Sequence, residues 1–356
     1  MIRGQNGLNT SITPNLGPDR GPRLCWGLWA SLGFVGMTPR YDALDVNGAP
    51  LVPLPIVLGP TGSGKSALAQ RVALAVGGEI VNCDSLQVYR GFDIGTAKVP
   101  LEKRQGVPHH LIDVIDPDQL FTAGDYARLA EAALREIAGR GRVPVIAGGT
   151  GFYLRALLDG LFPGPVRDEA LRARLERREA SRPGSLHRIL TRLDRAAAAR
   201  IHPNDKNKTM RALEVRLIEG QPMSSLFERG RAPLTGFRPI KLGLDPPREL
   251  LHERLNARTH AMFEQGLVDE VRRLLVADVS RAAKPFESLG YKQALQTIDG
   301  ALAMEQALES TQLETRRYAK RQLTWFRKEH GMHWMAGFGD DPCIQDEALA
   351  IVQREI

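Results

Sequence analysis

The chain has 356 residues, of which 43% are hydrophobic and 25% charged, and a net charge of +7 with an isoelectric point near 9.5. This composition is typical of one large globular domain or two smaller ones. It excludes an integral membrane protein, because no apolar run reaches the ~18 residues of a membrane span. The three cysteines, Cys25, Cys83 and Cys343, are too far apart for a metal-binding spacing. We therefore expect a reducing compartment and no disulfides.

Residues 1–50 are rich in Gly, Pro and Asn and show no sustained periodicity. Within them, the apolar stretch 24–37 follows Arg20 and Arg23 and has the form of a signal-peptide core. We nevertheless expect a cytoplasmic protein, because the phosphate-binding loop that follows requires cytosolic ligands. We interpret the segment as a start codon assigned too early, with Met37 as the initiator, or as a disordered extension.

A glycine-rich loop lies between a short apolar run, residues 55–58, and an Ala- and Leu-rich helix, residues 67–76. It reads G-x-x-x-x-G-K-S, the P-loop pattern, and consists of Gly59, Pro60, Thr61, Gly62, Ser63, Gly64, Lys65 and Ser66. In this context the backbone N–H groups and the positive end of the helix dipole converge on one point. Lys65 adds an ammonium group for the outer phosphates, and Ser66 adds a hydroxyl for Mg²⁺. The motif predicts a phosphate ligand, but not the reaction.

Apolar runs alternate with helical patterns along the rest of the chain. We expect strands at residues 79–84, 111–115, 143–147 and 239–245, an amphipathic helix at 123–140 and a long helical region after 245. This alternation predicts an α/β fold, a P-loop NTPase-like parallel sheet flanked by helices. Asp84 and the polar residues after it follow the second strand, where open α/β sheets place ligand contacts.

The position of this acid separates the chain from the usual P-loop arrangement. Most P-loop enzymes transfer a phosphoryl group and hold Mg²⁺ with an acid at the end of a later strand. Here the strand 143–147 is followed by Gly148, Gly149 and Thr150, and the acid is Asp84. A carboxylate near a bound phosphate group can act as a general base. The pattern thus permits substitution at a carbon that bears a diphosphate, and equally a small-molecule kinase.

Basic residues gather in two stretches. Residues 166–211 contain thirteen lysines and arginines and six acids, and this excess of seven equals the net charge of the chain. Residues 315–328 form a helix pattern with Arg316, Lys320 and Arg327 on one face and a second basic row beside it, Arg317, Arg321 and Lys328. With Trp325 and Phe326 nearby, these rows suit phosphate backbone and exposed bases, although the aromatic rings also fit a buried core.

Several stretches together resemble the tRNA dimethylallyltransferases, also called isopentenyl-tRNA transferases, of the IPP transferase family. They occur in the family's order and span about residues 52–330: the P-loop, DSLQVYRGFDIGTAK (84–98), VPHHLID (107–113), AGGTGFY (147–153), NDKNKTMRALEV (204–215), SLGYKQ (288–293) and TRRYAKRQLTWFR (315–327).

This resemblance implies transfer of a dimethylallyl group from its diphosphate to N6 of the adenosine on the 3′ side of the tRNA anticodon. Diphosphate leaves, and Mg²⁺ assists. Asp84 matches the family's base, and Arg258 matches its diphosphate-binding arginine. Thr61 and Lys65 match functional positions of the loop. A nucleotide- or ATP-binding label would follow from the P-loop, yet the reaction consumes no ATP.

The resemblance also implies contacts to tRNA. They match Asp84, Ser85, Leu86 and Gln87, then Thr150 and Arg172, and finally Asn207, Lys208, Thr209, Met210 and Arg211. The target base must leave its stack to reach Asp84. Lys208 departs from the family pattern, which has arginine there, so the charge is kept and the bidentate fork is lost.

We expect four segments. These are an extension (1–50), a catalytic core (51–160 with 206–330), a small basic helical insertion domain that grips the anticodon stem-loop (161–205) and a C-terminal tail (331–356). A monomer is expected because tRNA fills the cleft. Two other hypotheses stay open from the residues alone: a P-loop small-molecule kinase, which leaves the basic insertion unexplained, and a non-catalytic RNA-binding protein.

Overall fold

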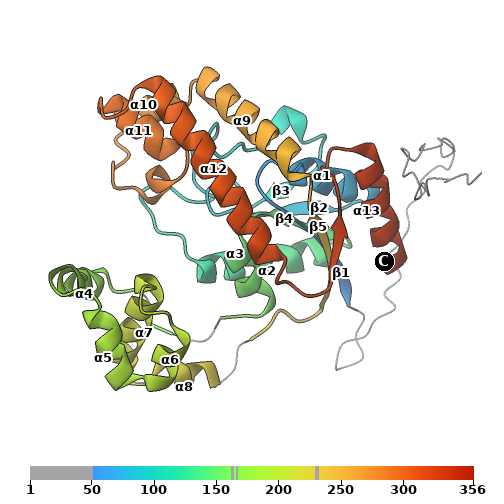
Figure 1. Ribbon diagram of the computed structural model, residues 1–356. Coiled ribbons are helices and arrows are strands. Elements are labelled where there is room, and N and C mark those ends of the chain that lie inside the picture. The colour runs from blue at the N-terminus through green and yellow to red at the C-terminus, as the bar shows by residue number, and fades with distance from the viewer. Residues whose placement is uncertain (1–50, 162–163, 166, 229–231) are drawn as a thin grey trace, which may run out of the picture. The chain divides into compact units, whose positions relative to one another are not determined.

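The structure is a computed structural model that describes residues 51–161, 164–165, 167–228 and 232–356 (Figure 1). The interpretations of residues 1–50, including Cys25 and the initiator at Met37, lie outside this part of the chain. Of the other two cysteines, Cys83 is buried and Cys343 is exposed.

A six-stranded parallel sheet forms the centre of the core, with the strand order β3-β2-β4-β1-β5-β6. The strands are β1 (Val52–Leu58), β2 (Glu79–Cys83), β3 (His109–His110), β4 (Pro144–Gly148), β5 (Phe237–Leu244) and β6 (Met332–Met335). Central strands of a parallel sheet are covered on both faces, so they consist of nearly continuous apolar residues. The predicted α/β fold is confirmed.

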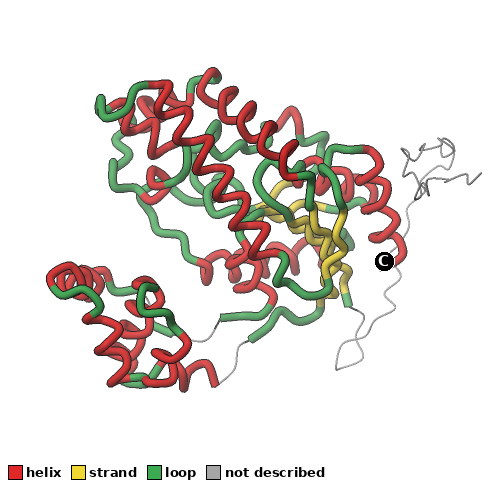
Figure 2. Tube along the Cα trace, viewed as in Figure 1, coloured by secondary structure: helices red, strands yellow, loops and turns green. Residues whose placement is uncertain are grey.

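Helices cover both faces of this sheet, as the strands between helices in Figure 2 show. On one face Leu54, Ile56 and Leu58 pack with α2 (Ala123–Gly139) and α3 (Gly151–Leu158). On the other face Val57 packs with α1 (Lys65–Val76) and α13 (Pro342–Glu355). Successive β1 side chains thus alternate between the two layers, as the twofold repeat of a strand requires.

A second group of helices follows β5. It contains α9 (Arg248–Glu264), α10 (Leu267–Val276), α11 (Tyr291–Ile298) and α12 (Met304–Phe326), with a short 3₁₀ turn, Lys284–Glu287, between α10 and α11. A second 3₁₀ turn, Leu101–Lys103, precedes β3. Val88, Tyr89 and Phe92, from the segment after β2, pack among α10 and α11. The polar block after β2 is therefore anchored to these helices by its apolar residues.

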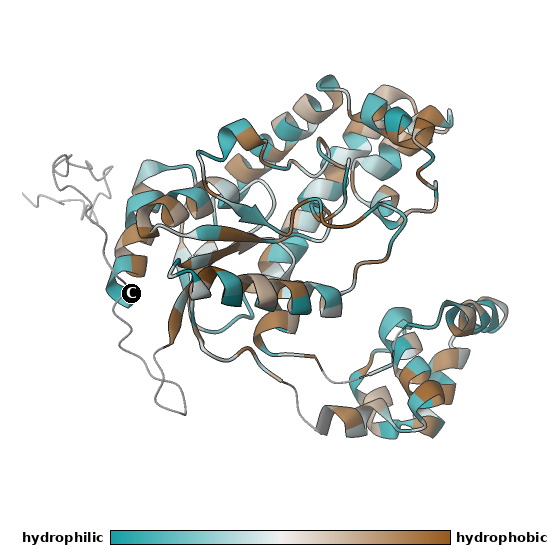
Figure 3. Ribbon diagram, turned by 180° about the vertical axis from the view of Figure 1, so that it is seen from behind, coloured by the Kyte–Doolittle hydropathy of each residue, from teal (hydrophilic) through white to brown (hydrophobic). Residues whose placement is uncertain are grey.

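The basic insertion is a helical domain with its own apolar core (Figure 3). It comprises α4 (Glu169–Ser181), α5 (Ser185–Leu193), α6 (Arg195–Arg200), α7 (Lys206–Glu219) and α8 (Met223–Glu228). The aspartates 168, 194 and 205 cap α4, α6 and α7 through their side chains. Because α7 and α8 pack in this core through Leu213 and Leu226, the domain extends past the predicted boundary at residue 205.

Two further predictions need correction. Residues 111–115 do not form a strand: Leu111 and Asp113 have φ of 60° and 55°, which is incompatible with extended backbone. Only Ile115 keeps a bridge, to Tyr89. Residues 331–356 are not a tail, because β6 extends the sheet beside β5 and α13 packs on α1.

Candidate active site

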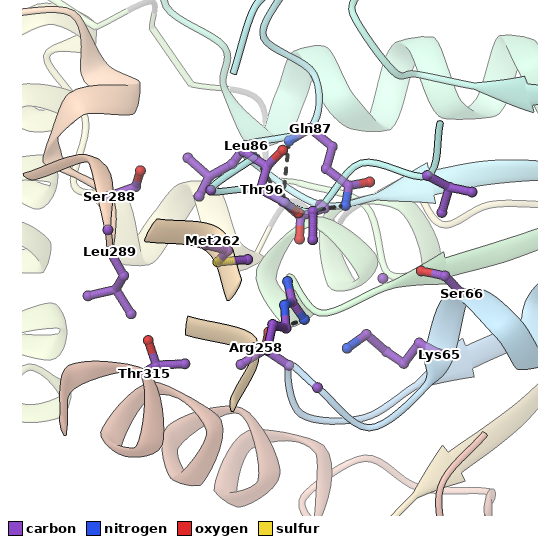
Figure 4. A pocket seen from close by; sticks show the side chains of 18 of the residues that line it. Lys65, Ser66, Leu86, Gln87, Thr96, Arg258, Met262, Ser288, Leu289 and Thr315 are labelled. Carbon is purple, nitrogen blue, oxygen red and sulfur yellow. Dashed lines mark hydrogen bonds between the residues drawn. The ribbon is translucent and has the colours of Figure 1, made fainter. Parts of the chain in front are cut away.

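A cavity of about 590 Å³ opens at the carboxyl ends of β1, β2 and β4 (Figure 4). Such edges are the usual binding sites of open α/β sheets. Besides the sheet, the lining includes the P-loop with the start of α1, the turn after Asp84, the loop 95–99, helix α9, the 287–290 turn and α12. The cavity therefore collects residues that lie more than 200 positions apart in the sequence.

The P-loop bends tightly between β1 and α1. Gly62 and Gly64 have φ of 78° and 85°, in the region that glycine adopts without strain. A Cβ at Gly64 would lie 2.7 Å from the backbone nitrogen of Gly339, so the segment after β6 packs directly against the loop. Gly339 N–H donates to the Ser63 carbonyl at 2.8 Å. The C-terminal residues thus support the loop from outside the cavity.

The predicted members of the loop divide into two groups. The cavity is lined by Thr61, Gly62, Gly64, Lys65 and Ser66, whereas Gly59, Pro60 and Ser63 are buried behind it. The Lys65 ammonium donates to the Pro60 carbonyl at 2.8 Å. Burial lowers the pKa of Lys65 to about 8, although the carboxylate of Asp84 opposes the shift.

Arg258 of α9 reaches the same region, and Figure 4 shows it and Lys65 extending into one space. Its Nη1 donates to the Thr61 hydroxyl at 3.4 Å. Burial lowers the pKa of Arg258, and again Asp84 opposes the shift. Lys65 and Arg258, both half-buried, thus lie near the Asp84 carboxylate at this end of the cavity, and Arg254 adds a third cation to the lining. This excess of positive charge suits a phosphate or diphosphate group.

Asp84 begins a tight turn after β2. Its Oδ1 accepts hydrogen bonds from the backbone N–H groups of Leu86, at 2.8 Å, and Gln87, at 3.4 Å. Among the residues described here, its Oδ2 accepts no hydrogen bond. Ser85 N–H donates to the Thr150 hydroxyl at 3.1 Å. Thr150 thus holds the turn from behind, and Asp84 is oriented with one oxygen available in the cavity.

The loop 93–98 is fixed by Glu270 and Tyr291, which were not among the predicted site residues. The buried Glu270 carboxylate accepts from the N–H groups of Asp93 and Ile94 at 3.2 and 3.0 Å, and from the Tyr291 hydroxyl at 2.5 Å. Gly95 N–H donates to that hydroxyl at 3.0 Å. The loop is joined to the turn after β2 through Gln87, whose amide donates to the carbonyl of Thr96 at 3.0 Å.

Helix α12 has two different faces. Its inner face carries Thr311, Thr315 and Tyr318, which line the cavity, and the buried Gln322. Its outer face carries the predicted basic rows, exposed at Arg317, Lys320, Arg321, Arg327 and Lys328 and half-buried at Arg316. The inner face was missed, although its spacing of four, three and four residues is that of one helical stripe.

The aromatic residues at the end of α12 belong to the core. Phe326 is completely buried, and Trp325 packs against the same apolar cluster, with the Arg155 guanidinium 4.6 Å from its ring centre. The expectation that they present themselves to bases is therefore wrong for Phe326, and Trp325 is already stacked within the protein. Only the basic rows remain available to a polyanion.

The residues predicted to bind tRNA in the insertion also divide. Asn207 and Lys208 are exposed, but Thr209 and Met210 are buried in the helical core, so their side chains cannot reach RNA. Arg172 and Arg211 both pair with the fully buried Glu214, at 3.0 and 2.6 Å. Their first role is structural, because they neutralise a buried carboxylate.

A metal ion would find few protein ligands here. In the described ranges no group of three or more His, Cys, Asp or Glu side chains could hold one. The exposed hydroxyl of Ser66 lines the cavity beside Lys65, and Mg²⁺ commonly binds through one such ligand, substrate phosphates and water. This donor set suits Mg²⁺ bound together with a phosphorylated substrate. None of the helices in the described residues has the length and apolar character needed to cross a membrane.

The fold and cavity together define a P-loop α/β protein in which the Asp84 carboxylate shares one cavity with the Lys65 and Arg258 cations. Comparison with known proteins identifies the class further. A sequence model of the IPP transferase family matches residues 87–329. The tRNA dimethylallyltransferases of Solibacter usitatus and Koribacter versatilis are 60% and 56% identical to this chain, over 85% and 84% of it and 99% and 97% of their own lengths.

Solved structures agree with this result. The tRNA isopentenylpyrophosphate transferase of Bacillus halodurans superposes with a TM-score of 0.62 at 36% identity, over 85% of this chain and 97% of that one. A eukaryotic dimethylallyltransferase acting on tRNA superposes with a TM-score of 0.72 at 27% identity, over 85% and 77%. The chain belongs to the IPP transferase family, as its motifs indicated.

Proposed function

We propose that this chain transfers the dimethylallyl group of dimethylallyl diphosphate to N6 of the adenosine 3′-adjacent to the anticodon in tRNA. The observation that carries the proposal is the shared cavity, in which the Asp84 carboxylate faces the Lys65 and Arg258 cations. The family membership and the names of the relatives support the same reaction.

Asp84 can act as the general base that the nucleophile of this reaction requires. The exocyclic amine of adenine is a poor nucleophile because its lone pair is delocalised into the ring. The N6 lone pair forms the new bond to C1 of the dimethylallyl group, and Asp84 takes the proton that N6 loses. The turn that fixes Oδ1 leaves Oδ2 for this proton.

The cations and N–H groups near the P-loop can stabilise the negative charge of the departing diphosphate. As the C1–O bond breaks, its electron pair passes to the diphosphate, and the allylic carbon gains positive character. Lys65, Arg258 and the P-loop N–H groups lie where that negative charge grows. Mg²⁺, held by Ser66 and the diphosphate oxygens, would supply further neutralisation of the leaving group.

The exposed basic rows of α12 and the arginine-rich insertion supply positive charge for the tRNA backbone. Within the turn after β2, Ser85, Leu86 and Gln87 would contact the flipped adenosine, with Thr150 supporting them. Among the earlier candidates in the insertion, Asn207 and Lys208 remain available for RNA. A cytoplasmic monomer is consistent with a tRNA substrate that fills the site.

A small-molecule kinase is not favoured, since the relatives are named as enzymes that act on tRNA. A non-catalytic RNA-binding role does not account for the half-buried Lys65 and Arg258 beside Asp84 in the cavity.

The test uses unmodified tRNA with an adenosine-rich anticodon loop, Mg²⁺ and radiolabelled dimethylallyl diphosphate. Wild type is compared with Asp84→Asn, which keeps the oxygen that accepts from Leu86. We expect label in the RNA with wild type and a loss of roughly 10²-fold or more in the variant, at unchanged tRNA affinity. Phosphate release from ATP without labelled RNA would replace the proposal with a kinase. Undiminished labelling by the variant would remove Asp84 from its role.

A further inference from the structure

One buried amide joins two parts of the cavity that the sequence keeps far apart. Gln322 of α12 is 7% exposed. Its Oε1 accepts the backbone N–H of Thr61 at 2.8 Å, and its Nε2 donates to the carbonyl of Gly149 at 2.9 Å. A glutamine side chain with both ends engaged in this way has one orientation, because its acceptor and donor cannot be exchanged.

The first of these bonds ends in the phosphate site. Thr61 lies inside the P-loop, and its hydroxyl also receives the guanidinium of Arg258 at 3.4 Å. Gln322 therefore holds the backbone of Thr61, the P-loop residue whose side chain contacts Arg258.

The second bond ends beside the proposed base. Gly149 is followed by Thr150, whose hydroxyl accepts the N–H of Ser85 at 3.1 Å, and Ser85 is the neighbour of Asp84. A path of three hydrogen bonds thus leads from the P-loop through Gln322 and the 149–150 turn to the segment that carries Asp84.

The packing around this amide is close. A Cβ at Gly149 would lie 2.4 Å from Nε2 of Gln322, and a Cβ at Gly151 would lie 2.2 Å from Nε1 of Trp325. The turn after β4 therefore approaches α12 more closely than any larger residue would allow. Glycine at positions 149 and 151 therefore leaves room for the Gln322 and Trp325 side chains of α12.

We propose that Gln322 is a positioning residue that sets the distance between the diphosphate cradle and the Asp84 carboxylate. The proposal rests on the reaction proposed above, in which both groups act on one substrate pair at once. Geometry of this kind affects turnover more than binding, because a misplacement of about 1 Å can cost roughly 10² in rate.

Gln322→Met tests this, since methionine has a similar length and volume but neither donor nor a good acceptor. Gln312→Met is the matched control on the same helix; it removes the 3.3 Å hydrogen bond from Gln312 to the Asn256 carbonyl. The measurements are kcat, the KM values for tRNA and dimethylallyl diphosphate, the affinity for inorganic pyrophosphate and the thermal unfolding midpoint.

We expect Gln322→Met to lower kcat by roughly 10–10²-fold and pyrophosphate affinity by several-fold. The KM for tRNA and the unfolding midpoint should stay near those of wild type and of Gln312→Met. Unchanged kcat would overturn the proposal, and so would a loss of kcat that is matched by loss of tRNA affinity or of folding.

Failure of the reaction itself is visible separately. If wild type transfers no label, the proposed function is wrong, and the pyrophosphate titration still decides whether Gln322 organises the phosphate site. Equal pyrophosphate affinity of wild type and Gln322→Met in that case would overturn its positioning role as well.

Discussion

The cavity of the core and the helical insertion are held together over different distances along the sequence. In the core, the P-loop and the loop 93–98 are fixed by partners 261 and 177 residues away, Gln322 and Glu270. In the insertion, Glu214 pairs with Arg211, three residues away, and with Arg172, 42 residues away, and α6 and α7 are capped by the residue before each of them. Chemistry at one carbon needs positions fixed by long-range contacts, whereas a surface for RNA phosphates needs charge on a stable domain.

The largest expected effect is the loss of stability of the insertion when its buried carboxylate, Glu214, is neutralised. Glu214→Gln leaves Arg172 and Arg211 without their carboxylate, which should destabilise the helical domain by about 3 kcal/mol. Hydrogen exchange of α4 and α7 should rise and tRNA affinity should fall, while pyrophosphate affinity stays unchanged. The exposed Glu219→Gln on the same helix is the control. A parallel loss of pyrophosphate affinity would show that the two regions are not independent.

The same carboxylate predicts that the insertion loses stability at acid pH. Burial raises the pKa of Glu214, but the hydrogen bonds from Arg172 and Arg211 outweigh it and lower the pKa from 4.5 to about 2. Its stabilising contribution is therefore complete above pH 4.5 and is lost as the pH falls toward 2.

A smaller effect comes from Lys65, whose pKa of about 8 makes the phosphate site titrate in the alkaline range. The affinity for dimethylallyl diphosphate should fall above pH 8, by up to about tenfold per pH unit as the ammonium loses its proton. Folding responds with the opposite sign. Because the unfolded lysine keeps its proton up to 10.5, the contribution of Lys65 to stability rises between pH 8 and 10.5. Lys65→Arg should remove the alkaline loss of affinity, and an identical decline in that variant would assign it to another group.

The smallest effect is expected on the outer face of α12. Lys320→Gln removes one exposed cation and should weaken tRNA binding only a few-fold, with the slope of log affinity against log salt reduced by roughly one. Arg71→Gln, an exposed change on α1, is the control. A large loss of kcat in Lys320→Gln would show that the outer face also takes part in positioning.

The sequence was informative where a local pattern implies a local structure. The P-loop, the strands β1, β2, β4 and β5 and the acid at Asp84 are each read from a few adjacent residues, since glycine turns and apolar runs fold in the same way in many contexts. The strand predicted at residues 111–115 was placed after the real strand β3, His109–His110. The left-handed backbone of Leu111 and Asp113 cannot be recognised from their side chains, so the apolar run suggested a strand.

The residues that complete the cavity could not be found in this way. Tyr291 and Gln322 lie in stretches that carry the family resemblance, and Glu270 lies in none of them. The hydrogen-bond partners of all three are known only once the chain is folded. The same reason explains the insertion. Arg172 resembles any other arginine of a basic helix, and only the packing of α4 on α7 commits it to Glu214.

The support of the P-loop by Gly339 has a consequence for how the protein is made. The loop is among the first described elements to leave the ribosome, yet the strand β6 and the turn that close its outer side are synthesised nearly 270 residues later. The nascent chain therefore carries a P-loop without this outer support until β6 and Gly339 have been synthesised, and a chain truncated before β6 lacks the support altogether.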